Sequence, residues 1–368
     1  MLNYEFPPLG GGAGNATSYL LKEFSMYPEL KFDLVTSSAN EFRVVEFANN
    51  ITIHFLDIKK NNLNLHYQTY KDLLTYTFKC YIYARKLHNQ NNYDFCHSFF
   101  GIPCGFIALK LGIPYIVSLR GSDVPFYSSR FYWLDKLVLK RLSRRVWEYA
   151  DKVITNSEGL KKLAQKTAPN LEFETINNGV DTKKFFPLKE KIINGKLKII
   201  STGRMIERKG YNYLIEALKA NDQIELTLIG EGNLTGKLKK MAKENFVNVK
   251  FLGKIEHDLL PDYLRKADIF VLPSLNEGMS NSVLEAMACG LPIITTDTGG
   301  SKEMIKGNGF VVGKGSIVDL RKAIAEYLNN RSLIKTHGNL SRKIAENISW
   351  NKIAKKYVGV YEKHEKEY

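Results

Sequence analysis

Residues 268–297 read DIFVLPSLNEGMSNSVLEAMACGLPIITTD, and this stretch decides the fold. Its apolar run at 269–272 is short and rich in branched or aromatic side chains, as is typical of a buried parallel strand. A polar loop follows, after which Ser280 is a suitable N-cap for a helix that Gly290 would end. A second apolar strand is expected at 293–296. In such a strand–loop–helix–strand unit the helix N-terminus lies at the carboxyl end of the sheet, where its N–H groups suit a diphosphate.

Two carboxylates, Glu277 and Glu285, flank this helix N-terminus. A carboxylate repels phosphate but accepts hydrogen bonds from hydroxyl groups, which are plentiful on ribose and on sugar rings. The spacing alone is equally compatible with two solvated glutamates on a surface helix. The pair therefore needs support from further residues before it predicts a hydroxyl-rich ligand.

The segment resembles the E-x7-E signature of the retaining glycosyltransferases of group 1, also called family 4 (GT4). Glu277 and Glu285 fall on its two glutamates, and the neighbouring letters PS, EAMACGLPII and GG match its usual surroundings. The resemblance implies an α/β protein of the GT-B fold, with two facing Rossmann-like domains, parallel sheets and a C-terminal crossover helix. The expected division is an N-terminal acceptor domain at 1–188, with a helix at 349–368 packing back on it, and a C-terminal nucleotide-sugar donor domain at 189–348.

The composition is that of a globular protein, with 368 residues of which 44% are hydrophobic, enough for two packed α/β domains. The four cysteines form no CxxC pair and read as buried thiols in a reducing compartment. No signal peptide or uncharged membrane-spanning run is visible, so a cytoplasmic protein is expected. The net charge of +15 is compatible with nucleic acid, an anionic membrane or phosphorylated ligands. Because no Lys/Arg block or aromatic–basic RNA motif occurs, nucleic acid is not an expected partner, and a mildly basic surface accounts for most of the charge.

Alternating strand and helix patterns along the chain predict a doubly wound parallel sheet. Only LNYEF precedes the loop PPLGGGAG, which is short for a first strand and leaves the order of the N-terminal sheet open. Asn15 is expected to cap a helix running to about Met26. The glycines do not fit G-x-G-x-x-G, so dinucleotide binding is disfavoured. In the family this loop approaches the donor, which implies donor contacts at Gly11 and Gly12 and acceptor contacts at Gly14 and Asn15.

Two aromatic-rich segments of the first domain carry apolar side chains at helical spacing. The first, at about 65–88, predicts an amphipathic helix packed on the sheet through Tyr67, Tyr70, Leu74, Phe78, Tyr81 and Ile82. The second, residues 126–149, combines aromatic residues and leucines with Arg130, Lys136, Lys140, Arg141, Arg144 and Arg145. It predicts a helix that either packs one face on the sheet or lies on an anionic membrane.

Arg120, Ser122 and Asp123 follow a predicted strand at 114–119, at the carboxyl edge where open α/β sheets bind ligands. Many members of the family carry histidine followed by glycine here, near the reacting sugar, whereas this chain has Arg120. Arginine does not act as a base, but it can stabilise a diphosphate or an anionic acceptor group. A structural ion pair with Asp123 is the alternative, and the sequence does not separate the two. The resemblance assigns these three residues to acceptor binding.

In the second domain the stretch TGRMIERKG contains Arg204 and Lys209, which match the family's two cations for the donor diphosphate. The resemblance also implies that Gly230 shapes the nucleoside pocket and that backbone at 254–255 holds the base. His257 is either a helix cap or a ligand contact. The implied donor-binding set is Gly11, Gly12, Arg204, Lys209, Gly230, Lys254, Ile255, Glu277, Gly278, Met279, Ser280, Asn281, Ser282, Leu284 and Glu285.

The resemblance implies a metal-independent, retaining hexosyltransferase with no cofactor besides its donor substrate, a nucleotide diphosphate sugar. Glu277, Arg204, Lys209 and Arg120 are the expected catalytic residues, and the sequence has no DxD motif to hold a metal. The expected acceptor is a hydroxyl group of a glycan or lipid-linked glycan, and the expected role is in polysaccharide or lipid-glycan biosynthesis. If residues 126–149 bind lipid, the protein is expected at the periphery of the inner face of the membrane. The alternatives are a UDP-sugar 2-epimerase and a non-catalytic binder of nucleotide sugars. The E-x7-E agreement argues against the first, and the joint presence of two cations and two glutamates argues against the second.

Overall fold

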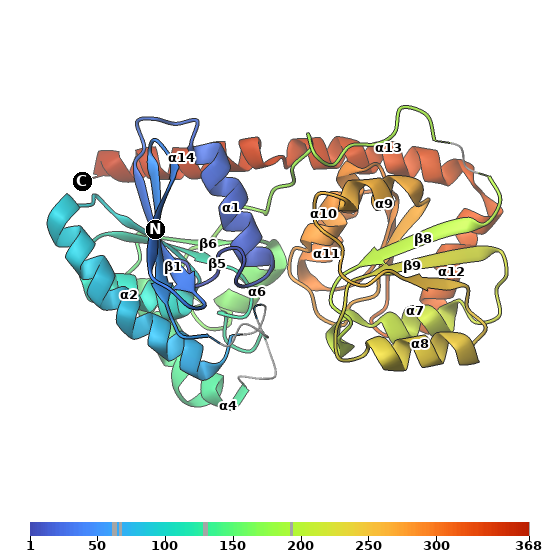
Figure 1. Ribbon diagram of the computed structural model, residues 1–368, viewed down its shortest axis with the longest axis horizontal. Helices are drawn as coiled ribbons and strands as arrows, with labels where there is room; N and C mark the ends of the chain where they lie inside the picture. The colour runs from blue at the N-terminus through green and yellow to red at the C-terminus, as the bar shows by residue number, and fades with distance from the viewer. Residues whose placement is uncertain (61–64, 66–67, 128–131, 192–193, 368) are drawn as a thin grey trace. The chain divides into compact units, whose positions relative to one another are not determined.

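The computed structural model describes residues 1–60, 65, 68–127, 132–191 and 194–367, which form two compact units (Figure 1). Unit 1 comprises Met1–Asn178 and Trp350–Tyr368, and unit 2 comprises Gly179–Ser349. Residues 179–188, assigned to the first domain from the sequence, group here with unit 2.

The sheet of unit 1 is assembled from two parts. Its strands are β1 (Phe32–Ser38), β2 (Arg43–Ala48), β3 (Ile51–Asp57), β4 (Cys96–Phe99), β5 (Tyr115–Leu119), β6 (Lys152–Thr155) and β7 (Glu174–Thr175). They pair in the orders β2–β3–β1 and β4–β5–β6–β7, and every pair is parallel except β2 with β3. Leu2 joins the two parts through parallel bridges with Val35 of β1 and Ser98 of β4. The short N-terminal segment is therefore central in the sheet, which settles the strand order that the sequence left open.

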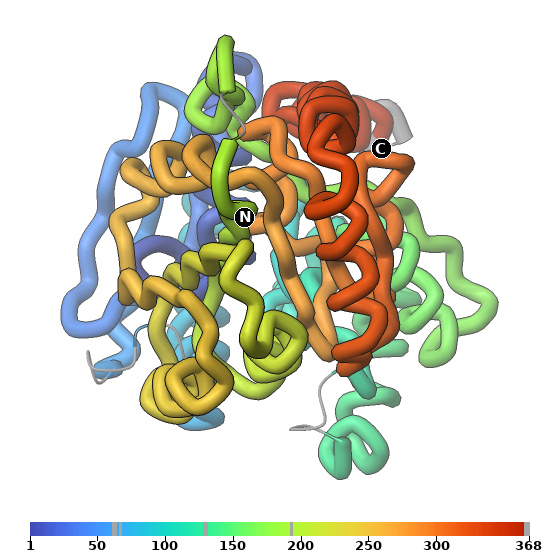
Figure 2. The backbone as a smooth tube through the Cα atoms, turned by 90° about the vertical axis from the view of Figure 1, so that its right-hand side faces the viewer, coloured from blue at the N-terminus to red at the C-terminus, as the bar shows by residue number. Residues whose placement is uncertain are grey.

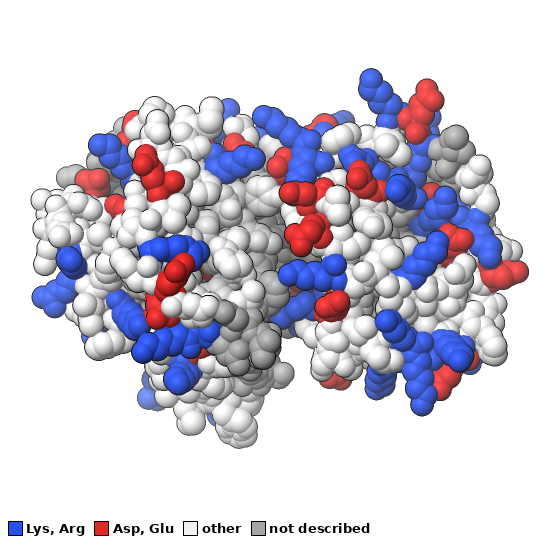
Figure 3. Space-filling view, in the orientation of Figure 1, with Lys and Arg blue, Asp and Glu red and all other residues white. Residues whose placement is uncertain are grey.

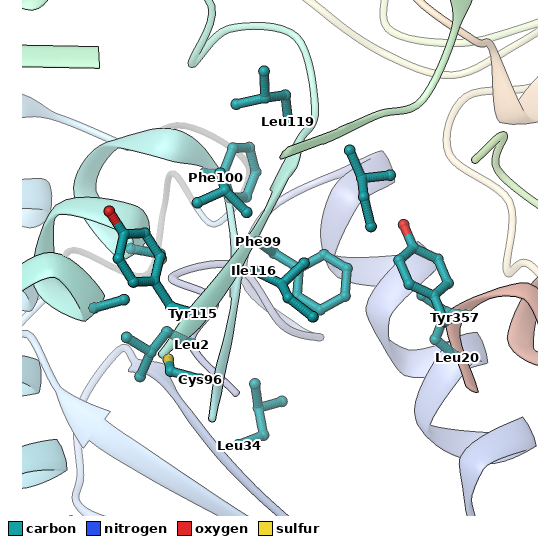
Figure 4. Packing of buried hydrophobic residues seen from close by; sticks show 14 of the residues in the cluster. Leu2, Leu20, Leu34, Cys96, Phe99, Phe100, Tyr115, Ile116, Leu119 and Tyr357 are labelled. Atoms are coloured by element: carbon teal, nitrogen blue, oxygen red, sulfur yellow. The ribbon is translucent and has the colours of Figure 1, made fainter. Parts of the chain in front are cut away.

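The helices of unit 1 share one core with this sheet. They are α1 (Gly12–Phe24), α2 (Tyr70–Asn91), α3 (Phe106–Leu111), α4 (Tyr132–Leu134), α5 (Lys140–Glu148), α6 (Glu158–Gln165) and α14 (Trp350–Glu367), with π-helical turns η2 (Gly101–Gly105) and η4 (Asp135–Leu139). Figure 4 shows Phe99 of β4 and Ile116 of β5 in the same cluster as Leu20 of α1 and Tyr357 of α14. The last helix thus completes the core that the first 178 residues begin.

The prediction for the buried face of α2 is wrong. The buried side chains are Tyr76, Cys80, Ala84 and Leu87, together with Asp72. Most of the predicted stripe is exposed instead, with Tyr70, Leu74, Phe78 and Ile82 between 49% and 71% exposed. Tyr81 alone among its described members is partly buried against the core, and Tyr67 lies outside the described residues. The small side chains of Cys80 and Ala84 let the helix approach the sheet closely, and the hydroxyl of Tyr76 donates to the carbonyl of Val35 at 3.0 Å.

The segment at 126–149 combines a packed half with an exposed half. Val146 and Trp147 of α5 are fully buried in the core. The turns before α5 expose the apolar side chains of Tyr132, Trp133, Leu137 and Val138. The exposed basic side chains of these turns and of α5 are Lys136, Lys140, Arg141, Arg144 and Arg145. Arg130 lies outside the described residues. Within the described ranges, no helix has the length and apolarity needed to cross a membrane.

Unit 2 contains a six-stranded parallel sheet in the order β10–β9–β8–β11–β12–β13. The strands are β8 (Leu197–Thr202), β9 (Ile224–Ile229), β10 (Val249–Phe251), β11 (Ile269–Leu272), β12 (Ile293–Thr296) and β13 (Gly309–Val312). The helices are α7 (Tyr211–Ala217), α8 (Thr235–Glu244), α9 (Leu260–Lys266), α10 (Asn281–Ala288), α11 (Gly299–Met304), α12 (Ile317–Asn329) and α13 (Ser332–Asn347), with a 3₁₀ turn η5 (Glu207–Lys209). The strands predicted at 269–272 and 293–296 are confirmed.

Each face of this sheet supports a core of its own. Along β11, Ile269 and Val271 belong to one hydrophobic cluster, whereas Phe270 and Leu272 belong to the other. Successive side chains of a strand point to opposite faces, and helices cover both faces here (Figures 1 and 2). Burial on both faces is the reason that this strand is a continuous apolar run rather than an alternating one.

Candidate functional site

The centre of unit 2 has the topology of a ligand site. The chain runs outward from β8 to β9 and β10, then returns to the other side of β8 and continues through β11, β12 and β13. Strands β8 and β11 are therefore neighbours from which the chain continues in opposite directions along the sheet, and such a switch point at the carboxyl ends of parallel strands is where α/β sheets bind ligands. The loops after these strands meet, because the backbone N–H of Leu275 donates to the carbonyl of Arg208 at 2.8 Å.

Glycines allow a close approach between the loops after neighbouring strands. Gly210 has φ +65°, and a Cβ atom there would lie 2.1 Å from the carbonyl oxygen of Pro273. Gly230 has φ +126°, and a Cβ atom there would lie 2.1 Å from the carbonyl oxygen of Gly203. Any larger residue at either position would push these loops apart. Gly230 thus shapes the ends of β8 and β9, which is compatible with the nucleoside-pocket role implied by the resemblance.

The switch point brings together Lys209 and Glu277, two of the expected catalytic residues. Lys209 Nζ lies 2.6 Å from Glu277 Oε2, and both side chains are nearly buried, at 10% and 13% exposed. Ser274 Oγ donates to the same carboxylate oxygen at 3.3 Å. Burial raises the pKa of Glu277, but the charges of Lys209 and then Arg208 outweigh burial and hold this pKa below its ordinary value. Glu277 is therefore an ionised carboxylate in a largely dry site.

The remaining donor-binding residues predicted for unit 2 differ in exposure to solvent. Arg204 and Lys254 are exposed, and Ile255 packs partly against the core. Ser280 is the N-cap of α10, as predicted, but its hydroxyl makes no capping hydrogen bond and instead lies 3.0 Å from Ser282 Oγ. The side chains of Met279 and Leu284 belong to the core. Gly278, Asn281 and Ser282 are half-buried around the first turn of this helix.

Glu285 has a partner that the sequence did not predict. His257 Nε2 lies 2.8 Å from Glu285 Oε1, and His257 Nδ1 lies 2.8 Å from Lys184 Nζ. The ammonium of Lys184 also contacts Asp258 Oδ1 at 2.6 Å. Of the two alternatives for His257, a helix cap and a ligand contact, the first is wrong, since α9 begins at Leu260 with Leu259 as its N-cap. No short motif links these positions in sequence, so only the fold reveals the contact.

The glycine loop of unit 1 follows Leu2 at the centre of the sheet. Its helix α1 begins at Gly12 with Gly11 as the N-cap, so the expectation that Asn15 caps this helix is wrong. The backbone N–H of Gly11 donates instead to the carboxylate of Glu5 at 3.1 Å, a residue that the sequence analysis did not single out. Anionic groups are favourable at helix N-termini. Gly14 is buried against the backbone of Glu5 and Leu9, whereas Asn15 is exposed.

Arg120 and Asp123 do not form the ion pair that was one of the two expectations. Arg120 Nη1 donates to Asn178 Oδ1 at 2.9 Å, and the guanidinium lies 4.6 Å from the ring centre of Phe99. The carboxylate of Asp123 accepts from the backbone N–H groups of Gly101, Arg120 and Gly121 at 2.8–2.9 Å. Burial nevertheless raises the pKa of Asp123. Asp123 thus holds its own loop, beside the exposed Ser122.

Arg120 also lies next to a buried polar chain in unit 1. His97 Nδ1 is 2.7 Å from the hydroxyl of Tyr361, and His97 Nε2 is 2.8 Å from Ser118 Oγ. Burial, followed by the positive charge of Arg120, lowers the pKa of His97 well below its ordinary value, so the imidazole is neutral. Among the described residues, Arg120 Nε and Nη2 are buried with no hydrogen-bond partner. Two donors of this arginine therefore remain unused by the fold.

The charge distribution around these residues is mixed. On the face drawn in Figure 3, basic side chains lie among acidic ones on both units.

Comparisons with known proteins place the chain in a family. The model described as Glycosyltransferase Family 4 matches residues 28–184, and the model described as Glycosyl transferases group 1 matches residues 182–348. An uncharacterized glycosyltransferase of Methanocaldococcus jannaschii is 30% identical over 302 residues, which cover 78% of this chain and 81% of that protein. The GDP-mannose-dependent monoacylated alpha-(1-6)-phosphatidylinositol monomannoside mannosyltransferase of Corynebacterium glutamicum is 32% identical over 180 residues, which cover 43% of this chain and 47% of that protein.

Solved structures show the same fold at lower identity. Sucrose-phosphate synthase from Thermosynechococcus elongatus superposes with a TM-score of 0.85 at 20% identity, covering 98% of this chain and 97% of that one. The Anabaena protein HepE, in complex with UDP and glucose, superposes with a TM-score of 0.74 at 18% identity, covering 98% of both chains. These likenesses confirm the GT-B fold with two Rossmann-like domains. Because two family models together span both units and one relative shares 30% identity over most of both chains, this protein belongs to the group 1 glycosyltransferases of family 4.

Proposed function

We propose that this glycosyltransferase transfers a hexose-type sugar, with retention at the anomeric carbon and without a metal, from a nucleotide diphosphate sugar to a hydroxyl acceptor. The main support is the pairing of Lys209 with Glu277 at the β8–β11 switch point, where a cation suited to diphosphate lies 2.6 Å from a carboxylate suited to sugar. A solved complex of HepE with UDP-glucose supports a nucleotide-sugar donor in a protein of the same fold.

Unit 2 has the charges that a diphosphate leaving group requires. Lys209 is held by Glu277, whereas Arg204 is exposed at the same loop. A diphosphate that approaches this loop meets both cations, and charge-assisted hydrogen bonds from them would stabilise the negative charge that grows on the leaving phosphate. Helix α10 begins at Asn281, shortly after Glu277, and the partial positive charge of its N-terminus favours a phosphate group there.

The reaction that fits these residues is a displacement on one face of the sugar. The bond from the anomeric carbon to the leaving phosphate oxygen breaks, and a bond to the acceptor oxygen forms on the same face. The acceptor proton moves to the leaving phosphate, so that no protein base is needed. Glu277, whose lowered pKa keeps it ionised, would support the positive charge that develops at the anomeric carbon. Its negative charge is worth more in the transition state than in the ground state.

The acceptor is assigned to residues of unit 1. Arg120 has two buried donors that no described residue uses, so an anionic or hydroxyl-rich acceptor is the chemistry that would satisfy them. Ser122, exposed beside it, can donate to and accept from a hydroxyl group. Gly11 and Gly12, both exposed at the start of α1, remain assigned to the donor instead, because glycine leaves room for a ligand at the backbone.

A lipid-linked acceptor is favoured by the surface of unit 1. Tyr132, Trp133, Leu137 and Val138 are 48–69% exposed and precede the exposed basic residues of α5. Aromatic and aliphatic side chains beside Lys and Arg are the composition that binds anionic membrane surfaces. The Corynebacterium glutamicum relative is named for a phosphatidylinositol mannoside acceptor. A peripheral position at the inner membrane face would bring this transferase to such an acceptor.

The assignment is tested by two matched substitutions. Glu277→Gln keeps the shape but removes the charge, so turnover should fall by about 10²-fold with little change in affinity for the free nucleotide. Glu285→Gln should mainly weaken nucleotide binding, because a ribose contact exists equally in the ground and transition states. Glu244→Gln, at the exposed end of α8, is the matched control and should behave as the wild type.

Steady-state kinetics and nucleotide titration measure these effects, and NMR of the product reports the anomeric configuration. Normal turnover in Glu277→Gln, or the reverse pattern in the two variants, would show that the roles are wrong. An inverted product would contradict retention.

A further inference from the structure

The carboxylate of Glu285 is held by a chain of side chains that starts at residue 184. Glu285 lies on α10, and its side chain is 15% exposed. His257 comes from the loop between β10 and α9 and reaches Glu285 Oε1 through Nε2 at 2.8 Å. Among the described residues, no side chain or backbone group binds the second oxygen, Oε2. One carboxylate oxygen is thus fixed by the protein while the other is left for a ligand.

The direction of the hydrogen bonds in this chain is determined by Lys184. An ammonium group only donates, so His257 Nδ1, which lies 2.8 Å from Lys184 Nζ, must accept. The ring proton is then on Nε2, where it donates to Glu285. Asp258 Oδ1 accepts from the same ammonium at 2.6 Å and holds Lys184 in place. Lys184 therefore selects the histidine tautomer that orients Glu285.

A role in core packing does not account for His257. Its side chain is 39% exposed, and its ring lies edge-on to Phe185, at 5.3 Å between ring centres. A carboxylate that accepts one hydrogen bond through Oε1 can still accept from two adjacent hydroxyl groups through Oε2.

We propose that His257 is a positioning residue for nucleotide recognition: it orients the carboxylate of Glu285 so that Oε2 accepts from the ribose hydroxyls, and Lys184 fixes the tautomer that makes this possible. The inference rests on the proposed function, in which Glu285 binds the ribose. It adds two residues, one from the loop after β10 and one from the segment that opens unit 2, to the recognition of the nucleotide.

The ribose hydroxyls provide a readout that a merely structural histidine would not change. UDP, GDP and ADP are titrated by calorimetry against the full-length protein, each beside its 2′,3′-dideoxy counterpart. The ratio of the two dissociation constants measures hydroxyl recognition alone, because base and diphosphate are shared. The wild-type protein should bind the ribonucleotide about 10-fold or more tightly than the dideoxy form.

Four variants separate the contributions. His257→Phe keeps a ring of similar shape against Phe185 but has no nitrogen, so the ratio should fall about 10-fold, towards one, as it should in Glu285→Gln. His257→Gln retains a side-chain N–H donor and should keep most of the ratio. Lys184→Met should lower the ratio because the tautomer is no longer fixed, whereas Lys183→Met, at the exposed neighbouring position, should leave it unchanged.

The outcomes distinguish the inference from the function on which it rests. If Glu285→Gln loses the ratio but His257→Phe and Lys184→Met keep it, the positioning role is wrong and the proposed function stands. If His257→Phe weakens ribo- and dideoxynucleotides equally, the histidine is structural and the inference is also overturned. If the wild-type protein binds none of the three nucleotides, or shows a ratio near one, the ribose role of Glu285 itself fails.

In the double variant His257→Phe, Glu285→Gln, the ratio should fall no further than in either single variant. Additive losses would mean that the two residues act independently, against the inference. Circular dichroism measures whether each variant is folded. If His257→Phe is unfolded, His257→Gln and Lys184→Met still test the positioning role of His257.

Discussion

Replacing Lys209 by methionine would show whether Glu277 is kept as an ion by its neighbour. The two side chains are 10% and 13% exposed and 2.6 Å apart, so methionine leaves a nearly buried carboxylate without its main counter-charge. Removing one partner of a buried ion pair typically costs about 3–5 kcal/mol. In a unit of this size each kcal/mol lowers the melting midpoint by roughly 2–4 °C, so scanning calorimetry should show unit 2 melting on the order of 10 °C lower.

The pH dependence of this effect has a definite sign. In the wild-type protein the pKa of Glu277 is lowered, so its contribution to stability is complete above the unfolded-state value of about 4.3 and is lost as pH falls through the folded-state value. Without Lys209, burial dominates and the pKa should lie above its ordinary value. Stability is then lost as pH rises through that raised value. The difference in midpoint between the two proteins should therefore widen from about pH 4 to pH 6.

Two further variants make the measurement specific. Lys237→Met removes an exposed lysine of the same unit and should leave the midpoint unchanged. The double variant Lys209→Met, Glu277→Met removes both charges and should recover most of the lost stability, because no unpaired ion stays buried. An unchanged midpoint in Lys209→Met, or a difference that does not grow with pH, would refute the reasoning.

Three other predictions concern the phosphate, the membrane and the core of unit 1. Arg204→Ala should weaken nucleotide diphosphate binding by about 1.5–3 kcal/mol in calorimetry, and an unaltered affinity would contradict the role of Arg204 at the diphosphate. EDTA should leave turnover unchanged, and loss of activity with EDTA would contradict metal independence. The protein should sediment with anionic vesicles at low salt and detach as the salt concentration rises. Leu137→Asp should reduce this binding. Equal binding to neutral vesicles would argue against an electrostatic membrane surface on unit 1. Tyr361→Phe leaves His97 Nδ1 without its partner and should destabilise unit 1 by about 1–3 kcal/mol. All three tryptophans lie in unit 1, so their fluorescence reports its unfolding by denaturant. An unchanged unfolding midpoint would show that the Tyr361 hydroxyl does not stabilise unit 1.

The sequence predicted best those features that depend on local pattern. The run at 269–272 is apolar without alternation because helices cover both faces of the sheet, and this pattern alone indicated a buried parallel strand. Glu277 was placed correctly at the carboxyl end of that strand, since a loop that follows a parallel strand always lies at that edge. Its ion pair with Lys209 joins two loops after neighbouring strands, and the pattern of each loop carries no information on this contact.

Features that depend on competition between distant groups were not predicted. Helix α2 has large apolar side chains on one face and the smaller Cys80 and Ala84 on another, and hydrophobicity favoured the wrong one. The face that packs on the sheet combines the small Cys80 and Ala84 with Tyr76, whose hydroxyl donates to the carbonyl of Val35. Similarly, Arg120 and Asp123 are close in sequence and of opposite charge, yet backbone N–H groups satisfy the carboxylate first. Opposite charge and closeness in sequence therefore do not predict an ion pair where backbone N–H groups are better placed to bind the carboxylate.

Helix α14 follows unit 2 in the sequence but packs in unit 1, and this has a consequence for the order in which the newly made protein folds. Unit 2 is one continuous segment, but the sheet of unit 1 binds Tyr357 and Tyr361, which leave the ribosome after all of unit 2. His97 and Ser118 are therefore translated long before the hydroxyl groups that satisfy them. We expect the nascent chain to finish unit 2 first, against the usual N-terminal-first order, and a chain arrested before Trp350 to display an open apolar sheet face that recruits chaperones.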